Sequence, residues 1–519
     1  GMSGAALQAL VRNPLAEPGL IGVSALAALG AVIAYYSGLS GTYAFALPLG
    51  GIIGAFLAVI ALFALTGRGR GTLTLILAGV AINSLGGALT ALALNLSPNP
   101  FAAYEIFFWL RGSLSNRSSE HVYMVLPLML CGWAFLLAAA RGLETFTLGE
   151  EVAATLGVNI ARTRWFVIVG SALAVGAGVA VAGIVGFVGL VVPHLLRPFV
   201  GHRPIVLLPV SARGRADARG GSRVTRPDWR RGTETRRRHG PHRRPVFPLS
   251  RTQDTPGRRM NCVEAHGIAV ELGGRRVLNG VDFALGAGEL VGLIGPNGSG
   301  KTTLLRTLCG LESPLAGHVA LAGDPLSELS PAVRARRIGY LPQHAVFHWP
   351  LTVANAVALG RHANAASLFG SAAADRAIIA DALAATGLSA MAERPVNELS
   401  GGEAMRVHIA RLLAGGHAAL IADEPVTSLD PRYQLELLAI LRRQAEAGIG
   451  VVLSLHDVPL AFRTCDRIVA MRDGEVTASG TPQAMIDDGI LKRVFSIDFD
   501  RVDTPSGMTV VARAPRENQ

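Results

Sequence analysis

The chain has 519 residues, which is enough for several domains, and half of them are hydrophobic whereas only 16% are charged. About a quarter of the residues in a typical soluble protein are charged, so this composition argues against a chain built only from ordinary soluble domains. The net charge of +11 does not predict a nucleic-acid partner, because residues 212–259 alone hold fifteen arginines and four acidic residues. The four cysteines are scattered, without CxxC pairs, and predict neither a zinc site nor a disulfide framework.

Long apolar runs fill most of the chain before residue 200. They begin at Gly19, Tyr43, Gly71, His121 and Trp165, and each reaches the roughly 20 residues that cross a bilayer core. The last run is long enough for a span and a second, shorter helix. Frequent Gly, Ala and Ser suit close helix packing in lipid. We therefore predict an all-α polytopic membrane domain in residues 1–211. Buried helices of a large soluble protein are the alternative, and we expect no signal peptide.

Five short segments of this half resemble, in order and spacing, the FecCD-type permeases of importers for iron–siderophores, haem and cobalamin. The segments are residues 12–24, 75–85, 108–115, 148–158 and 183–197. The similarity runs from Gly4 to about Ser211. The chain starts inside what resembles the second span of such a permease, and the similarity stops before the last two spans. The resemblance therefore implies a truncated permease domain.

Residues 212–259 form an arginine-rich segment that includes TETRRRHGPHRRPVFP. If its arginine codons begin with CG, the DNA read one base later can encode VVTALIGAP, a closing motif of the same permease family. We interpret the segment as a frameshifted permease tail that behaves as a disordered linker, with Met260 as the native start of the next gene. A basic arm for nucleic acid or anionic lipid is the alternative.

The sequence of residues 260–519 predicts a soluble α/β domain that contains a phosphate-binding loop. VGLIGPNGSGKTTLLRTL, at residues 291–308, predicts a buried strand, a glycine-rich loop and a helix. The glycines let backbone N–H groups point at phosphate oxygens at the helix N-terminus. We expect Lys301 to reach the β- and γ-phosphates and Thr302 to hold Mg²⁺. The candidate nucleotide-binding residues are Gly295, Pro296, Asn297, Gly298, Ser299, Gly300, Lys301, Thr302 and Thr303.

A second apolar segment, HAALIADEP at residues 417–425, ends in two carboxylates. It predicts a buried parallel strand that delivers these acids to its carboxyl end. Asp423 is then placed to support the Mg²⁺ shell, and Glu424 to polarise the attacking water. A surface turn with two acids is the alternative. Together with the loop, this segment predicts a P-loop NTPase.

LSGGEAMRVHIARLLA, at residues 399–414, lies between these two elements in the sequence. With them it makes residues 261–514 resemble an ATP-binding-cassette (ABC) ATPase, with Glu403 where glutamine is commoner. The resemblance implies two such domains that sandwich two ATP molecules. Ser400, Gly401 and Gly402 would then complete the site of a second ATPase subunit, so hydrolysis requires a dimer.

The same resemblance implies roles for three further positions. Gln343 matches the glutamine that senses Mg²⁺ and contacts the membrane partner, and His456 matches the histidine that contacts the γ-phosphate. Asp430, in the loop Ser428–Asp430, matches the segment that crosses the dimer interface. One position departs from the family, because Leu272 stands where an aromatic ring usually stacks on adenine, which predicts modestly weaker ATP binding.

The segment LGEEVAATLGV, at residues 148–158, is too polar to cross lipid and predicts a short amphipathic helix. In the permease family such a helix sits in a groove of the ATPase and transmits its closure. Gly149, Glu150 and Gly157 are therefore candidate coupling residues, with an ordinary solvated loop as the alternative.

These expectations combine into a truncated importer permease joined to a complete ABC ATPase. Its cofactors would be ATP and Mg²⁺, and its task the import of an iron complex or related chelate across the inner membrane. The implied partners are a second ATPase subunit, an intact permease subunit, a periplasmic binding protein and membrane lipid. The ATPase domain would be cytoplasmic. An exporter-type half-transporter and a soluble ABC ATPase with a degenerate apolar leader are the alternatives.

Overall fold

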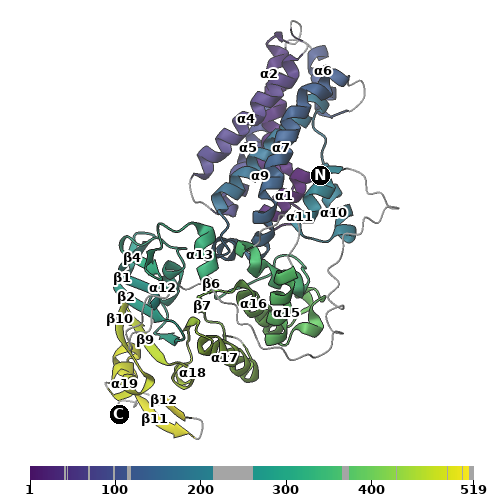
Figure 1. Cartoon of the computed structure of the whole chain (residues 1–519). Coiled ribbons are helices and arrows are strands. Elements are labelled where there is room, and N and C mark those ends of the chain that lie inside the picture. The colour runs from purple at the N-terminus through teal and green to yellow at the C-terminus, as the bar shows by residue number, and fades with distance from the viewer. Residues whose placement is uncertain are drawn as a thin grey trace, which may run out of the picture.

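The computed structural model describes residues 1–39, 43, 45–67, 71–97, 100–113, 118–213, 261–364, 373–427, 429–487, 489–504 and 507–513 (Figure 1). Nearly all of the arginine-rich segment 212–259, together with Ser428, lies outside these ranges. A bundle of long helices occupies one end of the molecule and an α/β domain the other (Figure 1). This order confirms the predicted fold class, an all-α membrane domain followed by an α/β domain.

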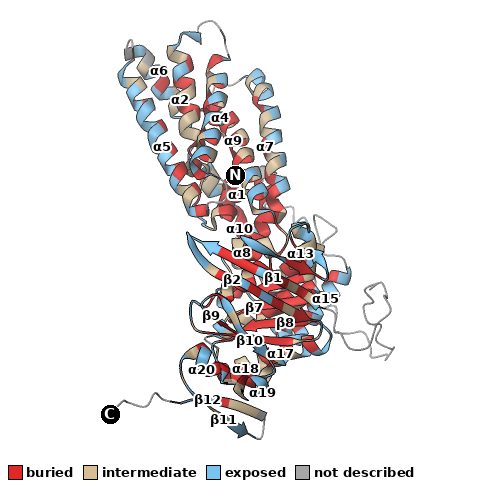
Figure 2. Cartoon of the chain, turned by 90° about the vertical axis from the view of Figure 1, so that its left-hand side faces the viewer, coloured by how far each residue is buried: buried red, intermediate tan, exposed pale blue. Residues whose placement is uncertain are grey.

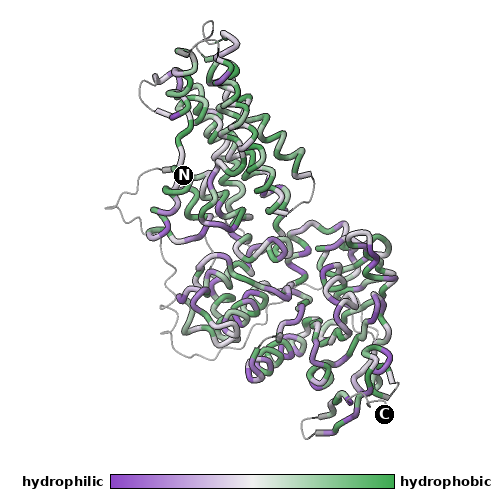
Figure 3. The backbone as a smooth tube through the Cα atoms, turned by 180° about the vertical axis from the view of Figure 1, so that it is seen from behind, coloured by the Kyte–Doolittle hydropathy of each residue, from purple (hydrophilic) through white to green (hydrophobic). Residues whose placement is uncertain are grey.

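The N-terminal domain contains helices only, within the described part of residues 1–213. Four of its helices are long and apolar enough to cross a membrane, at residues 46–66, 72–95, 119–148 and 160–182. The tube in Figure 3 shows that hydrophobic residues run along most of their length. The elements are α1 (Met2–Val11), η1 (Pro18–Ile21), α2 (Val23–Tyr36), α4 (Ala46–Thr66), α5 (Thr72–Asn95), α6 (Pro100–Leu110), α7 (Ser119–Thr145), η2 (Phe146–Leu148), α8 (Glu150–Thr155), α9 (Ile160–Ala182), α10 (Val188–Val200) and α11 (Pro204–Arg213).

The first apolar run differs from the prediction of a full-length span. It begins with the four-residue η1, turns at Gly22, and continues as the 14-residue α2. Gly22 adopts a left-handed conformation, with φ 74°, and an added Cβ would overlap Ile82 of α5. A helix cannot continue through that backbone conformation, so the run is divided. The last run agrees with the prediction, because α9 is followed by the shorter α10.

The membrane helices approach one another through glycine. An added Cβ on Gly54 of α4 would overlap the carbonyl oxygen of Leu26 in α2. Where α7 crosses α9, an added Cβ on Gly132 would lie 2.7 Å from the carbonyl oxygen of Gly170. Such contact between backbones is the packing that small residues permit in lipid.

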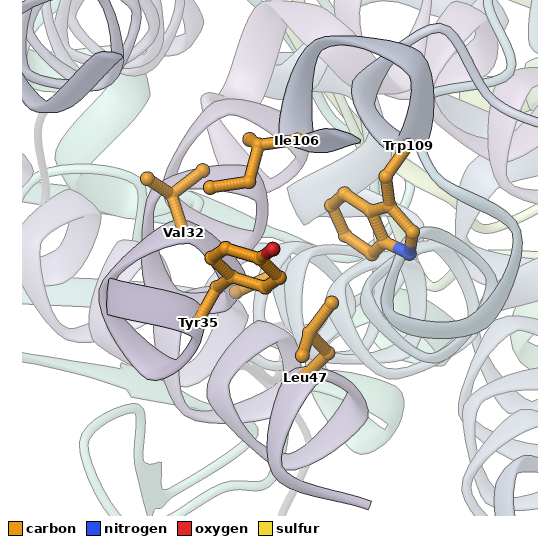
Figure 4. A pocket seen from close by; sticks show the side chains of 6 residues that line it. Val32, Tyr35, Leu47, Ile106 and Trp109 are labelled. Carbon is orange, nitrogen blue, oxygen red and sulfur yellow. The ribbon is translucent and has the colours of Figure 1, made fainter. Parts of the chain in front are cut away.

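The outer faces of the bundle carry large apolar side chains. Ile53, Phe56, Leu57 and Ile60 of α4 are each at least half exposed, and the outer faces of α5 and α7 are similar (Figure 2). A small apolar cavity of about 60 Å³ lies between α2, α4 and α6, where Tyr35 and Trp109 are part of its lining (Figure 4). The exposed apolar faces of α4, α5 and α7 suit a hydrocarbon environment.

A six-stranded sheet organises the C-terminal domain, in the order β10-β9-β3-β8-β7-β6. All neighbours in it are parallel except β10, which pairs with β9 in the antiparallel sense. A second sheet, β2-β1-β4-β5, is antiparallel, and β11 pairs with β12. The strands are β1 (Asn261–Leu272), β2 (Arg275–Gly286), β3 (Leu290–Ile294), β4 (Ala316–Leu321), β5 (Asp324–Pro325), β6 (Ile338–Leu341), β7 (Ala419–Asp423), β8 (Gly450–Ser454), β9 (Arg467–Arg472), β10 (Glu475–Gly480), β11 (Phe499–Thr504) and β12 (Gly507–Ala512).

Helices surround this sheet, and some of them lie between it and the membrane domain (Figure 1). They are α12 (Lys301–Leu308), α13 (Pro331–Arg337), α14 (Val353–Ala358), α15 (Ala373–Ala385), α16 (Gly401–Gly415), α17 (Pro431–Glu446), α18 (Val458–Thr464), α19 (Pro482–Asp487) and α20 (Ile490–Phe495). Strands β3, β7 and β8 are buried throughout and are neighbours in the sheet. Because they are parallel, their carboxyl ends meet at one edge, where the candidate site lies.

Candidate nucleotide site

The phosphate-binding loop connects β3 to α12, as the sequence predicts. Gly295 has φ 153° and Gly300 has φ 97°, and an added Cβ on Gly295 would overlap the carbonyl oxygen of Met471. Only glycine fits this combination of backbone angle and close approach. At the loop's end, the Nζ of Lys301 donates hydrogen bonds to the carbonyl oxygens of Gly295 at 2.7 Å and Pro296 at 3.1 Å.

Lys301 is buried at the start of α12, with only 6% of its surface exposed. Burial lowers the pKa of its ammonium group, and the nearby carboxylates of Glu424 and Asp423 oppose that change. These two acids are therefore close enough to Lys301 to act on its charge, which places the two predicted motifs in one site. A buried cation at the first turn of a helix adds to the positive field that the helix N-terminus presents to anions.

Asp423 and Glu424 are organised by a serine that the sequence analysis did not select. The hydroxyl of Ser454, the last residue of β8, donates to Oδ1 of Asp423 at 2.5 Å. The same hydroxyl accepts a hydrogen bond from the backbone N–H of Glu424 at 2.8 Å. Ser454 is fully buried. A serine at the end of a buried strand, two residues before the selected His456, is the signal that could have found it.

The Glu424 carboxylate is the meeting point of the predicted catalytic residues. Its Oε2 accepts hydrogen bonds from Nε2 of Gln343 at 2.8 Å and from the hydroxyl of Thr427 at 3.3 Å. Its Oε1 is hydrogen-bonded to Nε2 of His456. Glu424 has φ 51°, which is uncommon for a residue with a side chain and is typical of strained functional positions. The structure thus brings Gln343, Glu424 and His456 together, although they are far apart in the sequence.

The signature residues occupy a different part of the domain. Ser400 caps α16, accepting a hydrogen bond from the N–H of Glu403, and the Glu403 carboxylate accepts from the N–H of Ser400 in return. Gly402 lies against the ring of Tyr433, and the exposed Asp430 begins α17. Figure 1 shows α16, the helix that Ser400 caps, apart from α12, the helix that follows the phosphate-binding loop.

The predicted short helix of the permease half is α8, and it lies against the C-terminal domain. Leu148, Val152 and Leu156 share a hydrophobic cluster with Val353 and other residues of the second half. Gly157 has φ 87°, and an added Cβ there would lie 3.0 Å from Cα of Ala332 at the start of α13. The backbone therefore needs glycine at this contact. Gly149, with φ 91°, begins the helix.

Glu150, one of the candidate coupling residues, faces the membrane domain. Its carboxylate forms an ion pair with Arg164 at 3.2 Å and is hydrogen-bonded to Thr72. The next residue, Glu151, faces the other way and pairs with Arg306 at 2.8 Å. The ion pair that joins the two domains at this helix is thus made by a residue that the sequence analysis did not select, whereas the selected Gly157 makes a backbone contact with α13. Leu272, which stands where the family usually has an aromatic ring, lies at the end of β1 and is 40% exposed.

The fold and site define a membrane permease domain joined to a P-loop ATPase domain. The chain belongs to the ABC transporter family: residues 278–427 match the ABC transporter family, and residues 1–214 match the FecCD transport family. The resemblance of each half to its family is therefore confirmed.

Proteins similar to the second half carry the same kind of domain. The chain is 40% identical over 257 residues to the hemin import ATP-binding protein HmuV of Nocardia farcinica, covering 48% of this chain and 88% of that protein. It is 41% identical over 234 residues to the cobalamin import ATP-binding protein BtuD of Halobacterium salinarum, covering 45% of this chain. The match spans 58% of that second relative's length. A solved ATP-binding subunit of an ABC transporter is 29% identical, with a TM-score of 0.40, over 45% of this chain and 93% of that one.

Proposed function

We propose that the chain uses ATP hydrolysis to drive import of a metal chelate, such as an iron–siderophore, haem or cobalamin, through a membrane permease. The observation that carries the proposal is the Glu424 carboxylate, which is held by Gln343 and His456 at the sheet edge that also bears the phosphate-binding loop. A carboxylate fixed in this way can orient and polarise a water molecule for attack on the γ-phosphate. His456, which is hydrogen-bonded to that carboxylate, would contact the phosphate.

The site also suits Mg²⁺. Oδ2 of Asp423 is buried and has no hydrogen-bond partner among the described residues, whereas its Oδ1 is occupied by Ser454. A buried carboxylate oxygen left without a donor is costly unless a cation joins it. Thr302 at the start of α12 and Gln343 after β6 would complete the protein's part of the shell. Bound Mg²⁺ would neutralise charge on the phosphates during transfer.

The substrate class follows from the similar proteins and from the permease half. The relatives are named for import of hemin and of cobalamin, and residues 1–214 match the FecCD transport family. These features favour an importer over an exporter-type half-transporter. The four candidate spans favour a membrane transporter over a soluble ATPase with an apolar leader. The working complex would contain a second ATPase subunit, an intact permease subunit and a periplasmic binding protein, in the inner membrane, with the ATPase domain cytoplasmic.

The domain boundaries and the arginine-rich segment form part of this proposal. We place the permease domain at residues 1–211, a frameshifted linker at 212–259 and the ATPase domain at 260–519. The FecCD match ends at residue 214, which supports an interruption near that point. Sequencing the gene tests the idea, because it requires a second reading frame near codon 229 that encodes VVTALIGAP. If that frame is absent, the frameshift is wrong.

Substitution of the loop lysine in the full chain tests the ATPase function. The sequence contains two lysines, and Lys492, which pairs with Asp498 on the surface, provides the matched control. We expect Lys301→Ala to weaken ATP binding by about tenfold or more, as loss of a charge-assisted hydrogen bond predicts, and to remove ATPase activity. Lys492→Ala should behave as the unchanged chain. Equal ATP affinity in both variants would overturn the site assignment.

A further inference from the structure

Two histidines lie side by side on the exposed face of the second sheet of the ATPase domain. His266 of β1 and His318 of β4 are direct partners in the antiparallel pairing of these two strands. Their imidazole rings have centroids 5.3 Å apart, and the ring planes are inclined by 39°. Both side chains are exposed, whereas the adjoining Ala265 and Val319 are buried in the apolar cluster beneath the sheet. The pair therefore lies outside the core and is open to ligands from solvent.

A β-bulge sets the position of His266. The register of β1 against β2 shifts between Ala265 and Ile268, so that His266 and Gly267 together lie opposite Asp282. Gly267 has φ 59°, and its N–H donates a hydrogen bond to Oδ1 of Asp282 at 2.8 Å. The same carboxylate oxygen lies 4.0 Å from Nδ1 of His266. Bulges often redirect a side chain, and this one brings a fixed carboxylate beside one nitrogen of the ring.

Glycine allows β4 to approach β1 closely beside this pair. Gly317 precedes His318 and has φ 84°. An added Cβ there would lie 2.3 Å from the carbonyl oxygen of His266 and would overlap it. Only glycine fits this combination of backbone angle and close approach. The distance between the two imidazole rings is therefore set by the backbones of the two strands.

The spacing of the rings suits one metal ion held between them. Imidazole nitrogens bind zinc at about 2.0–2.1 Å, and two rings on one tetrahedral ion then have centroids roughly 5 Å apart. Carboxylates lie near both nitrogens of His266, because Oε2 of Glu264 is 3.9 Å from its Nε2 and Asp282 is on the Nδ1 side. A metal-bound histidine commonly donates its other ring N–H to a carboxylate, which fixes the orientation of the ring.

We propose that His266 and His318 bind a divalent late first-row transition-metal ion, such as Zn²⁺ or Ni²⁺, on this face of the sheet. Imidazole suits these ions, whereas Mg²⁺ prefers oxygen ligands. Among the described residues, no group of three or more His, Cys, Asp and Glu side chains is arranged to hold a metal ion, so water would fill the remaining coordination positions. Glu264 and Asp282 would balance the charge of the ion. The bound ion would cross-link β1 to β4, and the proposal does not rest on the ATPase function.

Titration calorimetry on the full chain tests the site, in phospholipid nanodiscs that are free of histidine tags. Ni²⁺ is the probe, at pH 7.5, without nucleotide and with excess Mg²⁺. The variants are His266→Gln, His318→Gln and both together. His121→Gln is the matched control, because His121 of α7 is hydrogen-bonded to Ser118 and has no carboxylate partner among the described residues. Beyond any sites that all variants share, we expect the unchanged chain and the control to bind one Ni²⁺. Each single variant should weaken that binding by about tenfold or more, and the double variant should lose no more, since one imidazole alone cannot chelate.

Asp282→Asn tests the orientation of His266 by a second route. Asparagine keeps an acceptor for the N–H of Gly267 but lacks the charge, so Ni²⁺ should bind about tenfold more weakly. Glu271→Gln, at an exposed position farther along β1, should leave the affinity unchanged. All of these side chains except His121 are exposed, and thermal midpoints without metal should match that of the unchanged chain. Equal Ni²⁺ affinity in every variant would overturn the proposal and show that the histidines and acids form surface ion pairs only. Losses that add in the double variant, or displacement of Ni²⁺ by Mg²⁺, would also overturn it.

Discussion

The interiors of the two halves of the chain are packed differently. The ATPase domain buries ionisable groups inside its fold, among them Lys301, His408, Arg411, His417, Asp423 and Glu424. The long helices of the permease domain instead meet through bare backbone, as Gly54 does against Leu26 and Gly132 against Gly170. Close contacts between backbones thus set the packing of the long permease helices, whereas buried charged groups and their partners set the nucleotide site of the ATPase domain.

The difference has a physical origin in the surroundings of each half. Lipid tails are as apolar as the helices, so burial of apolar side chains gives membrane helices little preference for one another, and close packing decides. A domain in water obtains its stability from apolar burial and can therefore accommodate a few charged groups that bind and hydrolyse a nucleotide. Substitutions should therefore affect chemistry in one half and assembly in the other.

The largest effect is expected for Glu424→Gln. The substitution keeps the shape of the side chain but removes the charge that polarises water, so kcat for ATP should fall by roughly 10²–10⁴-fold. ATP affinity should stay within about twofold, because the phosphate contacts of the loop remain. Steady-state kinetics and a nucleotide titration on the full chain measure both. Glu436→Gln, in an exposed ion pair with Arg432, is the control that should change neither.

The next effect is a pH dependence of stability that comes from a buried histidine. His417 precedes β7 and lies against Gly339 of β6. Burial, reinforced by the charge of Arg411, lowers its pKa to about 4. Because the pKa is about 6.5 in the unfolded chain, the unfolded state takes up the proton first, and stability falls as the pH drops from about 6.5 toward 4.

His417→Leu should remove part of that loss. At pH 5 the difference amounts to roughly 2 kcal/mol, and urea unfolding of the full chain at pH 7.5 and pH 5 would measure it. Some slope will remain, since burial lowers the pKa of His408 in the same direction. An identical change in midpoint for the variant and the unchanged chain would contradict the prediction.

A pair of glycine substitutions tests the membrane half. Gly54→Val would force α2 and α4 apart, because its Cβ overlaps the Leu26 carbonyl, whereas an added Cβ at Gly87 of α5 meets no atom of the described residues within 4 Å. Overpacking costs about 1–3 kcal/mol. We expect Gly54→Val to lower the thermal midpoint in detergent, and Gly87→Val to leave it nearly unchanged. Similar thermal midpoints in the two variants would contradict the idea that close contacts between backbones stabilise the permease domain.

The sequence predicts the nucleotide site better than the contact between the domains. Lys301, Glu424, Gln343 and His456 stand in local patterns, and parallel strands carry their ends to one edge of the sheet. Ser454 has a local signal, its place at the end of a strand before His456, but its partners Asp423 and Glu424 follow only from the pairing of β7 with β8, which the fold defines.

The helix α8 shows why the domain contact was harder to predict. Glu150 and Glu151 are identical neighbours, and successive residues on a helix point about 100° apart. The sequence does not fix the rotation of a six-residue helix, so it cannot say which carboxylate faces the ATPase. Packing of Leu148, Val152 and Leu156 into the cluster with Val353 sets that rotation. It turns Glu150 to Arg164 and Glu151 to Arg306.

The smallest effect is expected at Leu272. A substitution there should change the contact with the base of ATP but not the contacts with its charged phosphates. Leu272 is 40% exposed at the end of β1, so a larger ring fits there without displacing the core. Leu272→Tyr supplies a face on which adenine can stack, and an aromatic contact is worth about 1 kcal/mol, or roughly a fivefold gain in ATP affinity. The affinity for inorganic triphosphate should not change, because it lacks the base. A tyrosine that improves both ligands equally, or neither, would show that this edge of β1 does not meet the adenine.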